Sequence, residues 1–195
     1  MRSYSIVRTD QLAALGSPMR QEIVDAVARV PSASIAAIAA ALGRSANGLY
    51  YHVRELVRVG LLVPVGNGRD RDGARYRTVA RELFIAYDPS SPVNVARVSA
   101  AVGAMMRLGA RDFRRGFGAE DVVVGGPRRE LWAGRVTGWL TPSAVARVNR
   151  LMKQIYRVFH DSRPGSRERS FGMTLVLVPL ERRPREGRRP PKHRL

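Results

Sequence analysis

Residues 42–62 of this 195-residue chain read LGRSANGLYYHVRELVRVGLL, and this stretch decides the fold of the N-terminal half. Gly43 can take the left-handed backbone conformation that ends a helix abruptly. Ser45 follows at a position from which its side-chain oxygen can cap the free amides of a new helix. We therefore expect one helix to end at this glycine and a second helix to run over residues 45–59.

The predicted helix over residues 45–59 has two different sides. At about 100° per residue, Leu49, Val53 and Leu56 share one side with Gly60. A helix that lies in the major groove of DNA needs an apolar back and a polar front, because its polar side chains must reach bases and phosphates while its back packs on its own domain. An ordinary amphipathic surface helix would show the same division. The polar side consists of Asn47, Tyr50, Tyr51, Arg54 and Arg58.

The flanking sequence favours the DNA-binding interpretation. The apolar spacing from Ile35 to Leu42 predicts a short helix, for which Ser34 is the cap. Ser17 and Pro18 open an earlier helix by the cap-and-proline rule. The complete expectation is a helix over 9–15, a helix from 18, a helix over 35–42, the helix over 45–59, a strand over 61–65, a hairpin tip over 66–73 and a returning strand over 74–79. This order is that of a winged helix-turn-helix.

Residues 10–80 resemble the ArsR-type winged-helix regulators of bacteria. The matching pieces are LAALGSPMR at 12–20, the helix over 35–42, the run over 45–62 and RYR at 75–77. The resemblance implies a dimer across a two-fold DNA site, with one helix of each copy in the major groove. Many relatives sense metals through cysteines in the helix before the turn, whereas residues 35–42 read IAAIAAAL and offer no ligand. The residues that the resemblance implies for DNA contact are Ser45, Asn47, Tyr50, Tyr51 and Arg54.

The hairpin tip supplies a second group of candidate DNA contacts. Arg69, Arg71, Arg75 and Arg77 lie on or beside the tip, and arginine suits a narrow minor groove. Asp70 and Asp72 alternate with the first two arginines, so a solvated loop that neutralises itself is the alternative. Arg75 is the best candidate, because it does not lie between two acids.

The cysteine content, the apolar runs and the net charge of the chain exclude several kinds of site and favour some classes of partner. The chain contains no cysteine, which excludes disulfides, thiolate metal sites and cysteine nucleophiles. It has no apolar run near the roughly 20 residues of a membrane span, and we expect a cytoplasmic protein that does not bind membranes. The net charge of +18 suits a polyanion partner, but it divides into +4 for residues 1–88, +9 for 89–180 and +5 for 181–195. Most of the excess charge therefore lies outside the predicted DNA-binding segment.

The second half of the chain predicts a small α+β unit. A stretch with two prolines and two serines, residues 87–92, predicts a linker after a domain over 1–86. We expect the α+β unit to span 93–180, with a helix over 93–113, a strand over 130–140, a helix opened by Thr141 and Pro142, and a doubly buried strand over 171–178. Residues 181–195 are rich in Arg and Pro and predict a disordered basic tail. The overall fold class is therefore α+β.

Two roles suit this second half. One is dimerisation, with the helix over 93–113 packing on its symmetry mate. The other is a pocket for a small-molecule effector, although aromatic and Met side chains at such spacings are usually core. We expect no catalytic residue, metal or cofactor, and His52 is expected to be packed and hydrogen-bonded. The candidate pocket residues are Trp132, Trp139, Tyr156, Phe171 and Met173.

The sequence thus predicts a homodimeric, sequence-specific regulator that binds double-stranded DNA and represses by occupying an operator. One alternative is a nucleic-acid binder without sequence preference that uses the basic second half, including the stripe Arg150, Lys153 and Arg157, together with the tail. Another is a protein-interaction adaptor in which the winged helix docks a second protein.

Overall fold

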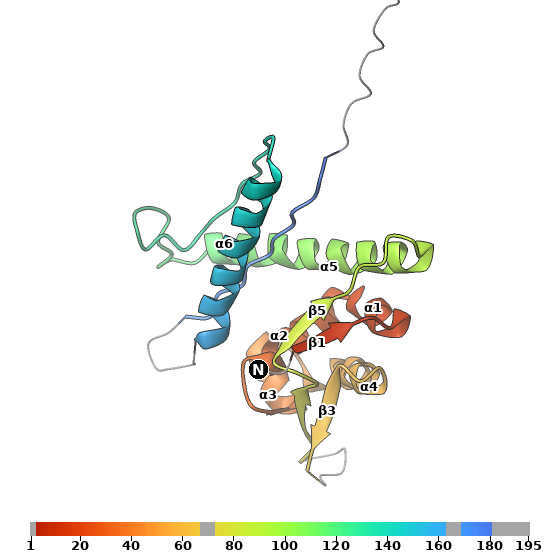
Figure 1. Cartoon of the computed structure of the whole chain (residues 1–195). Coiled ribbons are helices and arrows are strands. Elements are labelled where there is room, and N and C mark those ends of the chain that lie inside the picture. Colours follow the sequence, from red (N-terminus) through yellow and green to blue (C-terminus); the bar gives the residue numbers. More distant parts are fainter. Residues whose placement is uncertain (1–2, 67–72, 163–168, 181–195) are drawn as a thin grey trace, which may run out of the picture.

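The computed structural model describes residues 3–66, 73–162 and 169–180, and its fold is α+β as expected (Figure 1). The predicted hairpin tip and the basic tail lie largely or wholly outside these residues. In chain order the elements are β1 (Ser3–Ile6), α1 (Thr9–Leu15), α2 (Pro18–Ala28), β2 (Ala33–Ser34), α3 (Ile35–Leu42), a 3-10 turn (Ala46–Gly48), α4 (Tyr50–Arg58), β3 (Leu62–Val65), β4 (Arg75–Thr78), β5 (Glu82–Ile85), α5 (Pro92–Phe117) and α6 (Pro142–Asp161).

The N-terminal unit is a winged helix-turn-helix, as the sequence predicts. Helices α1 to α4 surround one apolar core, and β3 and β4 form the antiparallel wing beside it, with Val63 opposite Arg77 (Figure 1). Strand β2 adds a short third strand to the wing in the order β2-β4-β3. The predicted packing side of α4 is confirmed, because Leu49, Val53 and Leu56 are fully buried.

The turn between α3 and α4 is partly as predicted. Gly43 ends α3 in the left-handed region, at φ 61°, and the Ser34 side chain caps the start of the same helix. Ser45, however, makes no side-chain capping bond among the described residues. The predicted helix over 45–59 instead opens with the 3-10 turn and becomes α-helical at Tyr50. Asn47 and Gly48 are weak helix formers, which accounts for the tightened first turn.

A two-stranded parallel sheet was missed by the sequence reasoning. Strand β1 pairs with β5, with Tyr4 opposite Leu83 and Ile6 opposite Ile85. Both strands have only four residues, too few for a clear alternating pattern. Ile6 is buried in the core, and Tyr4, Leu83 and Ile85 pack against it.

Helix α5 is longer than the predicted 93–113 and packs on the N-terminal unit. Val98, Ala101, Ala104 and Leu108 are its buried residues, and Val98 and Ala101 belong to the same core as α1 to α4. Buried Gln21 of α2 reinforces the contact, since its side-chain amide donates to the Ala101 carbonyl at 2.9 Å. The chain beyond the predicted linker therefore returns to the first unit.

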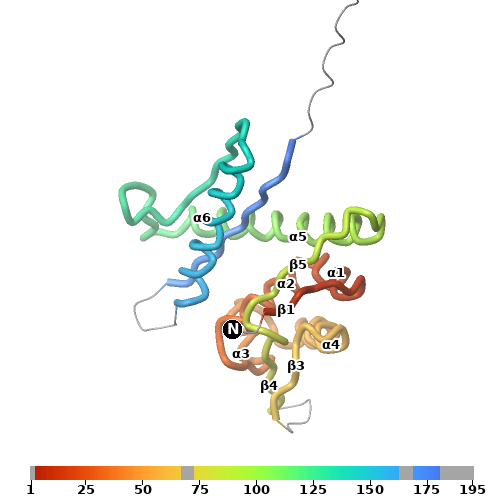
Figure 2. The backbone as a smooth tube through the Cα atoms, viewed as in Figure 1, coloured from red at the N-terminus to blue at the C-terminus, as the bar shows by residue number. Residues whose placement is uncertain are grey.

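The rest of the C-terminal half differs most from expectation. Helix α6 is confirmed, with the Thr141 side chain accepting from the Ala144 amide. The predicted strands over 130–140 and 171–178 are wrong for the described chain, where both segments run without ladder pairing (Figure 2). The segment over 171–178, expected to be buried on both faces, is mostly exposed. A strand needs a partner, and neither segment pairs with any strand of the described residues.

Ser34 before α3 and Ser45 before the 3-10 turn give a direct test of the capping assignments. Ser34→Ala removes an observed bond from the Ala37 amide at 3.2 Å, so we expect it to lower the free energy of unfolding by about 0.5–2 kcal/mol. Ser45→Ala removes no capping bond and is expected to leave that free energy within about 0.5 kcal/mol of wild type. Urea titrations of both variants provide the measurement, and equal losses would contradict the assignment.

Candidate nucleic-acid interface

The polar side of α4 and the turn before it form the candidate interface. Asn47 on the 3-10 turn and Arg54 on α4 are exposed, and the Tyr51 side chain is 70% exposed. We call these three residues the outer face of α4. Ser45 is also exposed, one residue before the 3-10 turn. These side chains lie opposite the buried apolar side, so the helix presents them outward without loss of packing.

The two adjacent tyrosines occupy different environments. Tyr51 is exposed, and its ring meets that of His52 edge-on at a centroid distance of 5.5 Å. Tyr50 is half-buried and packs against the apolar core at the flank of the helix. The sequence assigned both to the DNA-contacting side. In the structure Tyr50 is shared between that side and the packing side.

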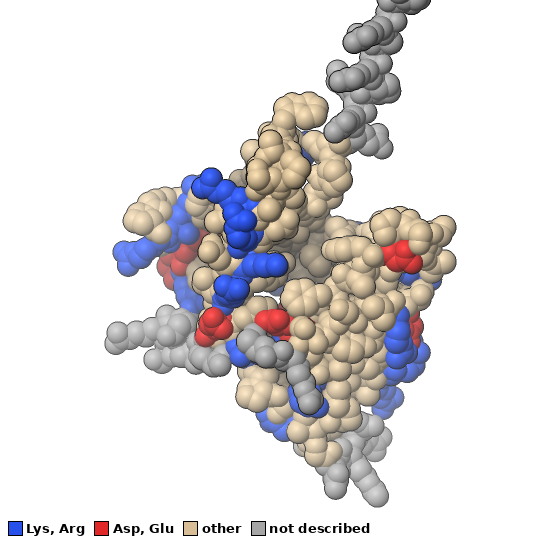
Figure 3. All heavy atoms as spheres, in the orientation of Figure 1, with Lys and Arg blue, Asp and Glu red and all other residues tan. Residues whose placement is uncertain are grey.

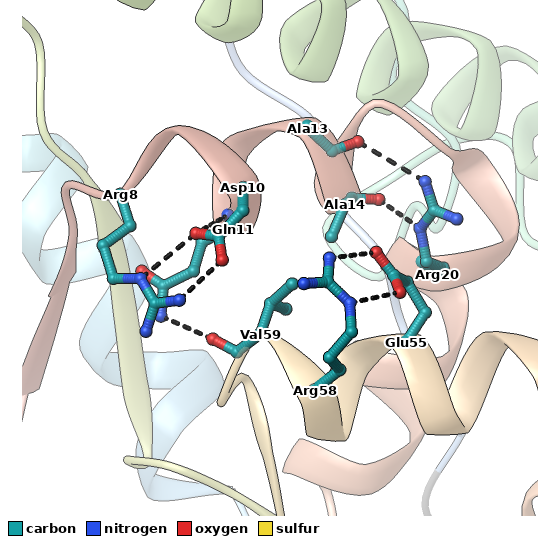
Figure 4. Close-up of polar contacts among 9 residues, drawn as sticks. All are labelled: Arg8, Asp10, Gln11, Ala13, Ala14, Arg20, Glu55, Arg58 and Val59. Atoms are coloured by element: carbon teal, nitrogen blue, oxygen red, sulfur yellow. Dashed lines mark hydrogen bonds and ion pairs between the residues drawn. The ribbon is translucent and has the colours of Figure 1, made fainter.

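The charges on α4 are not equivalent. Arg58 donates to both carboxylate oxygens of Glu55 at 2.7 and 2.8 Å, so its charge is largely balanced on the helix itself (Figure 4). The hydrogen bond with Arg58 holds the pKa of Glu55 below its ordinary value. Arg54 forms no ion pair within the described part of the chain. Arg54 is therefore the cation of α4 that is available to an outside anion.

Buried hydrogen bonds fix the C-terminal end of α4. Gln11 of α1 is buried, and its side-chain amide donates to the Val59 carbonyl at 3.0 Å (Figure 4). The same amide donates to the Tyr4 hydroxyl at 2.9 Å. The last carbonyls of a helix have no partner inside it, so this bond satisfies one of them and ties α4 to α1. The outer face consequently has a fixed direction relative to the core.

His52 is packed as expected, but the predicted hydrogen bond is missing. Its Nδ1 atom is buried and has no hydrogen-bond partner in the described chain. Burial, with the charge of Arg20, lowers the pKa of His52 below its ordinary value. The ring therefore stays neutral near pH 7.

The two described arginines of the wing, Arg75 and Arg77, are both exposed but differ in their contacts. Arg75 is exposed, but its guanidinium donates to the Ser32 hydroxyl at 2.9 Å and the Ser32 carbonyl at 2.6 Å. Arg77 alternates with buried Tyr76 on the same strand and is also exposed. Arg69 and Arg71 lie outside the described residues.

The predicted effector pocket is not enclosed by the single chain. Its five candidate residues are all exposed, from Met173 at 42% to Trp139 at 95%. Trp132 lies under the guanidinium of Arg129, whose carbon is 3.9 Å from the ring centroid. Side chains this exposed do not form the concave apolar wall that a small-molecule site needs. The five residues therefore form no enclosed pocket in the single described chain, and the effector site stays a prediction.

A buried carboxylate connects the turn before α4 with α5. The Glu22 side chain of α2 is 8% exposed and pairs with Arg111 of α5 at 2.5 Å and with Arg44, just after Gly43, at 3.5 Å. Burial by itself raises the pKa of Glu22, but the hydrogen bond from Arg111 and the nearby arginine charges outweigh it and leave that pKa below its ordinary value. One side chain thus joins the helix-turn-helix to the C-terminal half.

The described residues contain no group of three or more His, Cys, Asp or Glu side chains that could hold a metal ion. Within the same residues, no helix is long and apolar enough to cross a membrane.

Comparison with known proteins agrees with the geometry of the N-terminal unit. Residues 15–65 match the sequence model of the helix-turn-helix domain family, a span from the end of α1 to the end of β3. The matched span contains the whole outer face of α4. No curated protein matches the chain. The family match supports a DNA-binding regulator.

Replacing Glu22 by a neutral residue should make the free energy of unfolding less dependent on pH in the acidic range. We expect Glu22→Gln to lower the free energy of unfolding by about 1–2 kcal/mol at pH 7, because it leaves two partly exposed arginines without their partner. A lowered folded-state pKa contributes stability above the unfolded pKa of 4.5 and loses it as the pH falls through the folded value. The difference between wild type and variant should therefore shrink as the pH falls below about 4.5. Urea titrations across pH 2–7 measure this difference, with exposed Glu120→Gln as the control. A difference that stays constant over this range would contradict the account.

Proposed function

We propose that this protein is an ArsR-like transcription regulator that binds a specific double-stranded DNA sequence as a dimer and represses by occupying a promoter. The observation that carries the proposal is the outer face of α4. Its amide, phenol and guanidinium side chains point outward from a helix whose back is fully buried. The helix-turn-helix match over residues 15–65 supports the same assignment.

The chemistry of the outer face suits reading of base edges. An Asn side chain can donate to and accept from adenine, and an Arg fork can donate twice to guanine in the major groove. Asn47 and Arg54 provide these two groups, and exposed Tyr51 lies between them along the chain. Ser45 and Tyr50 flank this face, where contacts to the phosphates would set its position.

The wing would follow the DNA backbone beside the major groove. Arg77 and Arg75 are the described candidates on β4, and Arg69 and Arg71 extend the proposal to the hairpin tip. Arg75 would have to exchange its bonds to Ser32 for a phosphate. A phosphate contact of this kind adds affinity without sequence preference.

A second candidate function is nucleic-acid binding without sequence preference through α6. Arg147, Arg150, Lys153 and Arg157 lie on one side of α6, and all four are exposed. We call them the basic face of α6, and none of them forms an ion pair within residues 3–66, 73–162 and 169–180. Figure 3 shows basic side chains gathered over the C-terminal half on the face in view.

The adjacent tyrosines test the specific-regulator proposal. Selection from random duplexes by wild-type protein should yield a palindromic site whose half-sites are separated by about 10 base pairs or a multiple. For this site, we expect Tyr51→Ala to raise Kd by about 5- to 150-fold while leaving unfolding unchanged, because its ring is exposed. Tyr50→Ala should lower stability as well, since it removes a core contact. Anisotropy titrations and urea curves give both values. Enrichment of no sequence, or wild-type affinity in Tyr51→Ala, would contradict the proposal.

Variants of α6 separate the second candidate from the first. If α4 is the specific reader, Arg150→Ala with Arg157→Ala should change the ratio of Kd values for selected and scrambled duplexes by less than about twofold. Deletion of residues 181–195 should also leave the footprint on the selected site intact. Loss of nearly all affinity in either variant, with no preference for the selected duplex in wild type, would favour the charge-driven function.

A further inference from the structure

The chain exposes far more surface than a compact monomer of its size. Its accessible surface is 15668 Å², whereas a compact protein of 21.6 kDa exposes about 9,200 Å². The 29 residues outside the described ranges would expose about 5,200 Å² if they were fully extended, and a compact protein of the remaining mass, about 18 kDa, would expose about 8,000 Å². The described residues still exceed that compact value by about 2,400 Å². The described fold is therefore incomplete as a single chain.

The excess apolar surface lies in the C-terminal half. The buried core ends at Leu108, and after it no residue of the described chain is fully buried. Val136 and Trp139 are 96% and 95% exposed. Large apolar side chains exposed together in this way mark an interaction surface, because soluble monomers rarely show such extensive patches.

Helix α6 has an apolar face that the rest of the described chain covers only in part. At about 100° per residue, this face lies opposite the basic face. All of its residues are exposed or only half-buried, so the helix makes no closed core in the described chain. The apolar face consists of Val145, Val148, Leu151, Met152, Ile155 and Phe159.

Two extended segments adjoin this incomplete region. Residues 130–140 and 171–180 have the aromatic and β-branched composition of strands, yet they pair with nothing in the described chain. The second segment is nevertheless held in place. A Cβ atom on Gly109 of α5 would lie 2.8 Å from the Thr174 hydroxyl, and Arg29 donates to the Ser170 hydroxyl at 2.7 Å. Thr174 is the half-buried residue of a segment whose apolar side chains are exposed.

We propose that a second copy of this chain completes the C-terminal half. The apolar face of α6 in each copy packs against the C-terminal half of the other. The segments 130–140 and 171–180 become strands, because their ladder partners are supplied by the second copy. This inference goes beyond the proposed DNA binding, and it assigns the interface to α6 and the extended segments rather than to α5.

The exposed area and the charges favour a second copy as the occupant. Covering an excess of about 2,400 Å² on each of two chains buries roughly 4,800 Å², which falls in the class of obligate homodimers. The basic faces of α6 lie opposite the apolar faces, so pairing of the apolar faces does not force eight cations together. The buried face of α5 is already occupied by α1 and α2, which leaves the C-terminal half for the partner.

The test is the mass of the full chain in solution without DNA. Wild-type protein in sedimentation equilibrium should have twice the 21.6 kDa chain mass at micromolar concentration. Val136→Asp and Ile155→Asp should each weaken the dimer by at least about 100-fold, because they place a carboxylate in a desolvated interface. In a single chain Val136 is 96% exposed, so its substitution would change nothing there.

Arg157→Asp is the matched control, since it places the same carboxylate on the opposite face of α6 and should leave the protein dimeric. Far-ultraviolet circular dichroism checks that all variants keep their helices. A monomeric wild type, a mass that grows without limit as concentration rises, or a Val136→Asp protein as dimeric as wild type would overturn the proposal.

Hydrogen exchange tests the strand pairing separately. The amides of residues 171–178 should be at least about 100-fold more protected in the wild-type dimer than in the Val136→Asp monomer. Equal, fast exchange in both would overturn the sheet. These measurements contain no DNA, so a wild-type dimer that binds no DNA would contradict only the proposed function. A protein that selects a palindromic site but stays dimeric in both Val136→Asp and Ile155→Asp would contradict only this inference.

Discussion

The burial of one side of α4 is the constraint on which the N-terminal unit depends. Leu49, Val53 and Leu56 are removed from water by α1, α2 and α3, and at roughly 1.5–3 kcal/mol for each large side chain this contact dominates the local energetics. Because the packing side is fixed, the direction of Tyr51 and Arg54 is fixed with it. The bond from Gln11 to the Val59 carbonyl then holds the far end of the helix. The candidate interface is therefore a consequence of the core.

Helix α5 connects the N-terminal unit rigidly to the second half of the chain. Its buried Val98 and Ala101 pack on the N-terminal unit, and the Glu22 carboxylate joins Arg111 on α5 to Arg44 beside the turn. These contacts connect the positions of the proposed dimer interface and the proposed DNA-reading face. In a two-fold dimer, the distance between two copies of α4 would be set by these rigid connections and would determine the spacing of the half-sites.

Local signals predicted the N-terminal unit well, because its helices are specified by residues close in sequence. Gly43 could be recognised as a helix end and Ser34 as a cap before any contact was known. The same reasoning failed for Ser45, where the weak helix propensity of Asn47 and Gly48 favoured a 3-10 turn. It also failed to place Arg75 on Ser32, a contact between residues 43 positions apart. Side-chain bonds of this range leave no periodic signal in a sequence.

In the second half of the chain, local sequence signals did not predict which segments form strands. Residues 171–178 have the composition of a strand, but pairing is a property of two segments, and no described strand pairs with this one.

A single measurement tests the central claim that the outer face of α4 reads DNA. A photoreactive phenylalanine analogue would replace Tyr51 in one protein and Arg157 in another, each bound to the duplex selected by wild type. The account predicts cross-links to bases from position 51 and few from position 157. Cross-links from position 157 alone would contradict it.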